Sequence, residues 1–284
     1  MDLIIEIIKG VLIGIANIIP GVSGGTMAVS MGIYDKLIYS ITHLFSEFKK
    51  SVLTLLPYGA GMLIGIGALS FLIEYIFKYY PLQTAFAFIG LIYGGLPVIW
   101  KKTKRKPMGM SNILLFVFGF ALIVVLQLMD TGGSKEVELS IDAFMLLKLF
   151  VIGGIASATM VIPGVSGSMI LMLLGYYHSI IETITSTITA AIHLDFTGFL
   201  QGACLLAPFA LGILAGIIII AKIIEILLKG FESQTYSCIL GLVTASPVAI
   251  LGGIEIAGLN PSIIISSIVC LLICFMVPYK LFPE

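Results

Sequence analysis

Long apolar runs alternate with short polar stretches along the whole chain, and several runs are long enough to span a bilayer. A transmembrane helix needs about 20 mainly apolar residues. The runs that meet this requirement most clearly lie at 52–73, 83–100, 109–129, 203–222, 235–252 and 262–279. The pattern predicts an all-α polytopic membrane protein with about six full spans.

Two further apolar regions, 3–42 and 144–189, are each interrupted by nearly the same helix-breaking phrase. The first copy reads IPGVSGGT at 19–26 and the second reads IPGVSGSM at 162–169. A broken backbone cannot face lipid, because its unsatisfied polar groups would be costly there. We therefore expect two helical hairpins, broken or re-entrant at these motifs. Full crossings with a kink remain an alternative, because the second arms are nearly long enough to span.

The two halves of the chain also match outside these motifs. At an offset of 151 residues, seven positions agree in register and without a gap. The pairs are Pro57 with Pro208, Gly61 with Gly212, Gly65 with Gly216, Glu74 with Glu225, Lys78 with Lys229, Gln83 with Gln234 and Gly90 with Gly241. This predicts a duplication: a first repeat at 1–106, a connecting span and external loop at 107–142, and a second repeat with a final span at 143–284.

Charged residues outside the spans predict the orientation in the membrane. The segment KKTKRK at 101–106 has five basic residues in six and is expected in the cytoplasm, whereas the acidic stretch at 129–142 is expected outside. Lys49, Lys50 and Lys280 then fall inside, and both termini are cytoplasmic. The first repeat begins inside and the second outside. The repeats are thus expected to be inverted, an arrangement typical of secondary transporters with a substrate site near the midplane.

Composition excludes several classes of function. The chain is 59% hydrophobic and only 11% charged, against about 25% charged residues in a soluble domain. The net charge is zero, which excludes a nucleic-acid partner. Cys270 and Cys274 lie four residues apart in an apolar run with no histidine or acid beside them, so we expect packing residues and no metal site.

The two motifs have the chemistry of an anion site, most naturally a phosphate site. Each would supply free N–H groups at a helix start, glycines that permit close approach, and hydroxyls. The expected phosphate-binding residues are Gly21, Ser23, Gly24, Gly25 and Thr26 in the first copy and Gly164, Ser166, Gly167 and Ser168 in the second. Alternatively, both motifs are only tight turns whose hydroxyls bond local carbonyls. Two copies in an inverted repeat favour binding.

Other polar residues are candidates for a polar track or for coupling to protons or sodium. They are Asn17, Asp35, His178, Glu74, Glu225, Gln83 and Gln234. Asp35 stands beside Lys36, and an interfacial position is its favoured interpretation. Glu74 and Glu225 each precede a lysine by four residues, which indicates ion pairs at helix ends. The two glutamines line the cavity or join helices, and His43 and His193 are expected at the surface.

The stretches NIIPGVSGGTMA at 17–28 and MVIPGVSGSMIL at 160–171, with the repeat pattern and the length, resemble the polyprenyl-phosphate transporter family of bacterial membrane proteins. The resemblance covers essentially the whole chain. It implies a non-enzymatic transporter without a cofactor, located in the cytoplasmic membrane. Its substrate would be undecaprenyl phosphate, returned from the outer to the inner leaflet for cell-wall synthesis. Met160 and Met169 replace Asn17 and Thr26 in the second copy, so the first site is expected to be more polar.

Two other functions remain open from the sequence. A channel or secondary transporter for a small soluble ion would use the same backbone groups. A membrane lipid phosphatase would need a nucleophile and general acid, typically histidines with arginines around the phosphate. The chain has three histidines, which are not clustered, and its only arginine is Arg105, so the phosphatase is the weaker alternative.

Overall fold

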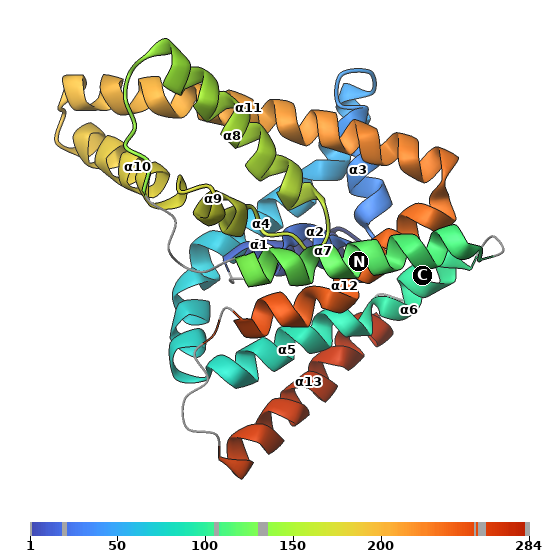
Figure 1. Cartoon of the computed structure of the whole chain (residues 1–284). Helices are drawn as coiled ribbons and strands as arrows, with labels where there is room; N and C mark the ends of the chain where they lie inside the picture. Colours follow the sequence, from blue (N-terminus) through green and yellow to red (C-terminus); the bar gives the residue numbers. More distant parts are fainter. Residues whose placement is uncertain are drawn as a thin grey trace. The chain divides into compact units, whose positions relative to one another are not determined.

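The computed structural model describes residues 2–18, 22–104, 108–129, 136–252, 254 and 260–281 (Figure 1). All regular secondary structure in these residues is helical. Within these described residues, seven helical segments are long and apolar enough to cross a membrane: Phe48–Leu69, Pro81–Thr103, Met110–Met129, Ala143–Val161, Phe196–Gly230, Glu232–Gly252 and Pro261–Pro278. The predicted polytopic all-α membrane protein is confirmed. Six of the seven coincide with the expected spans, and Ala143–Val161 is the first arm of the second expected hairpin.

The chain divides into two compact units. The first unit comprises Met1–Gln127, Ile162–Val165 and Ala221–Glu284, and the second comprises Leu128–Val161 and Ser166–Ile220. Helices of the first unit are α1 Asp2–Ile18, α2 Gly24–Ser30, α3 Tyr34–Thr42, α4 Phe48–Tyr79, α5 Pro81–Gly94, α6 Leu96–Thr103, α7 Met110–Met129, α12 Glu232–Gly252 and α13 Pro261–Leu281. Helices of the second unit are α8 Ala143–Val161, α9 Gly167–Leu173, α10 Tyr177–Ile192 and most of α11 Phe196–Gly230.

In the first unit, α1 packs along α4 through glycines. A side chain at Gly61 would overlap the carbonyl oxygen of Ile7, and a Cβ at Gly65 would lie 2.5 Å from the carbonyl oxygen of Val11. Small residues with this spacing let helix backbones approach closely, which matters in lipid because apolar side chains gain little by leaving it. Gly61 and Gly65, spaced Gly-x3-Gly, thus bring the backbone of α4 close to that of α1.

The second unit repeats this packing. A side chain at Gly212 in α11 would overlap the carbonyl oxygen of Phe150 in α8, and one at Gly216 would overlap the hydroxyl of Ser157. Around this contact lies a core of five buried residues: Met145, Leu149, Tyr176, Ile180 and Phe209. The glycines that match at an offset of 151 therefore make matching contacts. This agreement is what the predicted duplication would produce, and both the duplication and the inverted orientation of the two repeats stay predictions.

The second arm of each expected hairpin is not one helix but two. Gly32 separates α2 from α3 with φ 70°, and Gly175 separates α9 from α10 with φ 78°. Glycine adopts such positive φ values without steric cost, and this conformation commonly ends a helix. Each apolar region after a motif therefore holds two helices, α2 and α3 in the first region and α9 and α10 in the second. Gly32 and Gly175 are themselves equivalent, 143 residues apart like the two motifs.

The expected span at 83–100 is also divided, at Gly95 between α5 and α6. A side chain at Gly95 would overlap the backbone of Ser30 in α2. The hydroxyl of Ser30 donates a hydrogen bond to the carbonyl oxygen of Ile92, 3.2 Å away. All seven residues of α2 are buried. The junction of α5 and α6 thus fixes the helix that begins at the first motif.

The α1–α4 contact generates a stability prediction with an internal control. Gly61→Ala should lower the free energy of unfolding by about 1–3 kcal/mol, because its methyl group meets backbone that must move. Gly67→Ala on the same helix has open space around it and should be neutral, or stabilising by up to about 1 kcal/mol through helix propensity. Thermal unfolding of the two variants in detergent compares them directly. Equal unfolding temperatures would refute the packing argument.

Candidate functional site

The first motif forms a buried helix start. Its described residues begin at Val22, so Gly21 lies outside the described part of the chain. Ser23 is extended, with φ −114° and ψ 138°, and α2 begins at Gly24. The Asn17 side chain accepts a hydrogen bond from the Gly24 N–H at 3.2 Å. One of the N–H groups that helix starts leave unpaired is therefore satisfied by a residue on α1.

The Ser23 hydroxyl is the exception in this motif. The residue is 3% exposed, and its Oγ has no hydrogen-bond partner among the residues that the structure describes. Ser23 occupies the N-cap position of α2, yet its side chain makes no capping hydrogen bond. A buried hydroxyl without a partner costs about 1–3 kcal/mol. Such a group in a native protein requires an explanation, and a ligand is one.

The two motifs meet at Thr26 and Gly164. The Thr26 hydroxyl accepts a hydrogen bond from the Gly164 N–H at 2.6 Å, although the residues are 138 positions apart. Both belong to the first unit. Gly164 has φ +86°, and a Cβ there would lie 2.9 Å from the carbonyl oxygen of Leu242. A glycine is needed at this position for its backbone conformation and for the space around it.

The second motif continues into α9 of the second unit. Ser166 holds the same extended N-cap position as Ser23, with φ −97° and ψ 129°. Its hydroxyl lies 2.8 Å from that of Ser168, so these two are paired with each other. A Cβ at Gly167 would lie 2.7 Å from Cγ of Met160, the counterpart of Asn17. The Asn17 side chain that accepts a hydrogen bond at the start of α2 is thus replaced by the apolar side chain of Met160 at the start of α9.

Asp35 belongs to a partly buried polar cluster that the sequence did not reveal. Its carboxylate accepts a hydrogen bond from Lys102 Nζ at 2.8 Å and another from the Tyr236 hydroxyl, and Lys102 Nζ lies 3.2 Å from the same hydroxyl. Lys102 is only 9% exposed, although it belongs to the expected cytoplasmic basic loop. Lys36, the expected neighbour of Asp35, pairs with Glu6 at 2.5 Å instead. The cluster joins α3, α6 and α12.

Glu225 forms the predicted ion pair with Lys229 and further polar contacts. It is 5% exposed and lies 2.5 Å from Lys229 and 2.8 Å from Lys222. His43 Nδ1 lies 3.7 Å from the Glu225 carboxylate, so this histidine is partly buried instead of standing at the surface. The side chain of Glu74 lies outside the described part, and its predicted ion pair stays a prediction.

The remaining polar candidates lie in separate environments. Gln83 donates a hydrogen bond to the Ser266 hydroxyl at 3.2 Å and so joins α5 to α13. Gln234 is half-buried. His178 is exposed, with the edge of its ring against Tyr177 at 5.4 Å between centroids. His193, expected at the surface, is exposed.

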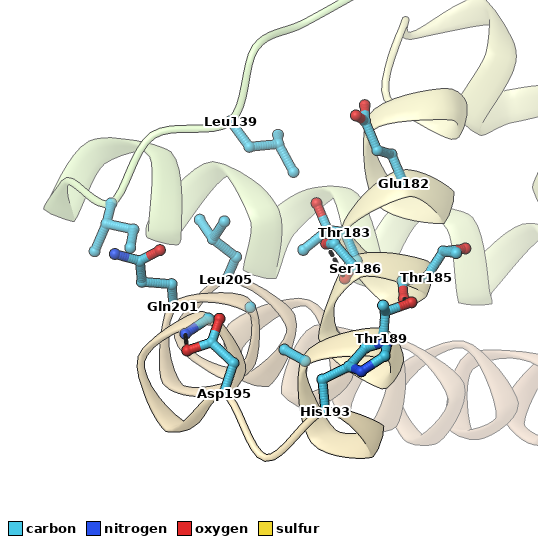
Figure 2. A pocket seen from close by; sticks show the side chains of 14 residues that line it. Leu139, Glu182, Thr183, Thr185, Ser186, Thr189, His193, Asp195, Gln201 and Leu205 are labelled. Atoms are coloured by element: carbon cyan, nitrogen blue, oxygen red, sulfur yellow. Dashed lines mark hydrogen bonds between the residues drawn. The ribbon is translucent and has the colours of Figure 1, made fainter.

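The second unit contains a cavity of about 710 Å³ between the C-terminal half of α10 and the start of α11 (Figure 2). Leu139, Glu182, Thr183, Ser186, His193, Asp195 and Gln201 are among the residues that line it. The motif residues do not line this cavity, and two carboxylates would repel a phosphate there. This cavity is therefore not the candidate anion site.

The bond between the motifs generates a prediction. Thr26→Val should destabilise the protein by about 1–3 kcal/mol, because the Gly164 N–H would remain buried without an acceptor. Thr26→Ser retains the hydroxyl and should recover most of this loss. Thermal unfolding compares the variants, and hydrogen exchange at the Gly164 amide locates the effect. A Thr26→Val protein as stable as Thr26→Ser would show that the motifs do not depend on this bond.

The Asp35–Lys102–Tyr236 cluster generates a second prediction. Asp35→Asn and Lys102→Met should each destabilise by about 1–3 kcal/mol, less than for a fully buried pair because the Asp35 side chain is 44% exposed. The double variant should lose less unfolding free energy than the sum of the two single losses, because it leaves neither charge of the pair without its partner. A double-mutant cycle in chemical denaturation measures this coupling. Strict additivity would mean that the two charges do not interact.

Comparison with known proteins identifies relatives over most of the chain. The undecaprenyl phosphate translocase-like family matches residues 13–258. A polyprenyl-phosphate transporter of Staphylococcus aureus is 34% identical over 253 residues, covering 88% of this chain and 87% of the relative. A polyprenyl-phosphate transporter of Vibrio cholerae is 26% identical over 262 residues, covering 85% of this chain and 75% of the relative. No solved structure is significantly similar. With the family match extending through both motifs, the chain belongs to the undecaprenyl phosphate translocase-like family.

Proposed function

We propose that this protein transports undecaprenyl phosphate, or a similar polyprenyl phosphate, from the outer to the inner leaflet of a bacterial cytoplasmic membrane. The transported lipid would serve carrier recycling in cell-wall synthesis, and both termini would be cytoplasmic. Seven candidate spans and two bacterial relatives named as polyprenyl-phosphate transporters support the proposal. A long isoprenoid can stay in the bilayer, so the protein needs to carry only the phosphate across. No catalytic step is required.

The unpartnered hydroxyl of Ser23 is the observation that carries the proposal. It is buried within the first motif and can donate to a phosphate oxygen. Three residues later, Thr26 uses its oxygen to accept from Gly164, which leaves its O–H as a second donor. In the proposed site these two hydroxyls act with the backbone of Gly21, Gly24 and Gly25.

The second motif would contribute the other half of the site. We assign phosphate contacts to Gly164, Ser166, Gly167 and Ser168, with Ser166 and Ser168 releasing their mutual hydrogen bond to donate to the phosphate. Inverted repeats would let the two halves move against each other around the bound head group, as secondary transporters do. The amide of Asn17 makes the first half the more polar one.

Transport into a negative-inside cell is uphill for the phosphate, by about 2.3 kcal/mol per charge per 100 mV. We propose coupling to protons or sodium as the source of this free energy. Asp35, Glu225 and His178 are the titratable candidates. Asp35 is the most direct candidate, because α3 follows α2 after a turn at Gly32 and Asp35 contacts both Lys102 and Tyr236.

Leaflet exchange in liposomes tests the proposal. Radiolabelled undecaprenyl phosphate is incorporated in both leaflets, and a soluble phosphatase added outside hydrolyses only the lipid that reaches the outer leaflet. The wild-type protein should make the whole pool accessible, whereas empty liposomes should protect the inner fraction. The Ser23→Ala/Ser166→Ala variant should slow exchange at least about tenfold, since each hydrogen bond to a charged group contributes about 1.5–3 kcal/mol.

Two controls separate a functional role from a structural one. Ser111→Ala removes an exposed hydroxyl of α7 and should exchange like the wild type. Ser23→Ala alone should leave the thermal stability unchanged or higher, because it removes a buried group without a partner. Absence of exchange, with and without a proton gradient, would favour a transporter of small soluble ions. Exchange unaffected in the double variant would reduce both motifs to structural turns.

A further inference from the structure

A pocket of about 480 Å³ in the first unit is lined by an excess of basic residues. Its lining residues are Glu6 of α1, Lys36 of α3, and Lys49, Lys50, Leu53 and Thr54 of α4. Three lysines therefore face one glutamate. Neither the motifs nor the polar candidates at 17, 35 and 225 line this pocket. It is a separate feature of the chain.

The acidic residues near the pocket are already paired. Glu6 accepts from Lys36 at 2.5 Å and from the Tyr58 hydroxyl at 3.3 Å. Lys50 pairs with Glu47 at 2.7 Å. Lys49 is exposed and forms no ion pair within the described residues. With Lys36 and Lys50 paired, Lys49 leaves the pocket with a positive charge that no acidic residue in the described part of the chain neutralises.

The position of the lysines on α4 is unfavourable for the helix itself. Lys49 and Lys50 are in its first turn, which contains no acidic residue. Positive charges destabilise the N-terminal end of a helix dipole, whereas a bound anion would stabilise it. Burial alone would lower the pKa of Lys36, but its hydrogen bond and charge interaction with Glu6 outweigh that effect and raise the pKa. Lys36 therefore stays charged at neutral pH.

The pocket adjoins exposed apolar side chains of α4. Leu53 lines it and is 60% exposed, and Leu56, almost one turn further along, is 62% exposed. Both are in the candidate span Phe48–Leu69. A soluble anion gains nothing from exposed leucines. A lipid anion can place its phosphate among the lysines and its chain along these leucines.

We propose that this lysine pocket binds the phosphate monoester head group of a membrane lipid at the membrane–water boundary. It is a second phosphate station, apart from the motifs, where the transported lipid is received or released on the face expected to be cytoplasmic. The assignment of that lipid as cargo rests on the proposed function, whereas binding of the head group does not. Compact ammonium groups suit this role, because lysine binds phosphate as a point charge.

Lysine footprinting tests the binding directly. The full chain is placed in nanodiscs of zwitterionic lipid, and an amine-reactive reagent labels accessible lysines, which mass spectrometry quantifies. Undecaprenyl phosphate or phosphatidic acid in the disc should protect Lys49 and Lys50. Undecaprenol, which lacks the phosphate, and inorganic phosphate in solution should not. Lys101 and Lys104, exposed on the expected cytoplasmic side, report on general attraction to an anionic surface.

Two results would overturn the proposal. Equal protection by inorganic phosphate would show a site for a soluble anion. Equal protection of Lys101 and Lys104 would show surface attraction alone, which is the ordinary consequence of basic residues next to a span.

Charge-removing variants link the pocket to transport. Lys49→Gln/Lys50→Gln should weaken binding of undecaprenyl phosphate in nanodiscs about tenfold, and Lys49→Arg/Lys50→Arg should recover most of it. Lys101→Gln/Lys104→Gln removes the same charge and should bind like the wild type. If Lys49→Gln/Lys50→Gln still binds undecaprenyl phosphate like the wild type, the pocket is not the binding site, whatever the result of the transport assay. A different outcome separates the two proposals. If the first variant loses binding while the wild type binds but shows no leaflet exchange, the pocket is retained and the proposed function is rejected.

Discussion

A polypeptide that breaks its helices among apolar residues must satisfy the backbone groups that the break exposes, and this constraint organises the first unit. Asn17 accepts from Gly24, and Thr26 accepts from Gly164. Asn17 lies on the helix just before the motif, whereas Gly164 lies 138 residues from Thr26. The first motif is therefore completed by α1 and by the second motif. The helix that follows it, α2, is buried along its whole length.

Close helix packing supports these breaks on both units. Lipid offers little hydrophobic advantage for helix association, so the helices depend on backbone approach at glycine. Gly61 brings α4 onto α1, and Gly212 brings α11 onto α8. In each unit the shorter helix of the pair leads directly into a motif. Packing at the glycines thus fixes α1 and α8, the helices that lead into the two motifs.

The sequence predicted what depends on local pattern and missed what depends on tertiary contacts. Span positions, the glycine contacts and the Glu225–Lys229 pair follow from hydropathy and helical spacing. The breaks at Gly32 and Gly175 had a signal, since both glycines match at the motif offset, but a glycine within an apolar run predicts a positive φ only weakly. The burial of Lys102 had no signal in the sequence. Nothing in the segment of five basic residues in six distinguishes Lys102 from its neighbours, and only the contacts with Asp35 and Tyr236 do so.

The structure also gives different hydrogen-bond partners to motif hydroxyls that look equivalent in the sequence. This difference is compatible with the proposed transport of a phosphate. The Thr26 hydroxyl bonds the other motif, and the hydroxyls of Ser166 and Ser168 bond each other. Of these four hydroxyl groups, only that of Ser23 is left without a partner. In the proposed site, such neutral donors would hold a phosphate without the full attraction of a lysine. Transport needs a site that binds the substrate yet releases it. In the first unit the lysine pocket concentrates full charges beside water, where attraction is weakened by solvent and salt. A phosphate would thus meet full charges in the lysine pocket, where solvent and salt screen them, and weaker dipoles at the buried motifs, where screening is small. This difference limits trapping of the substrate at either site.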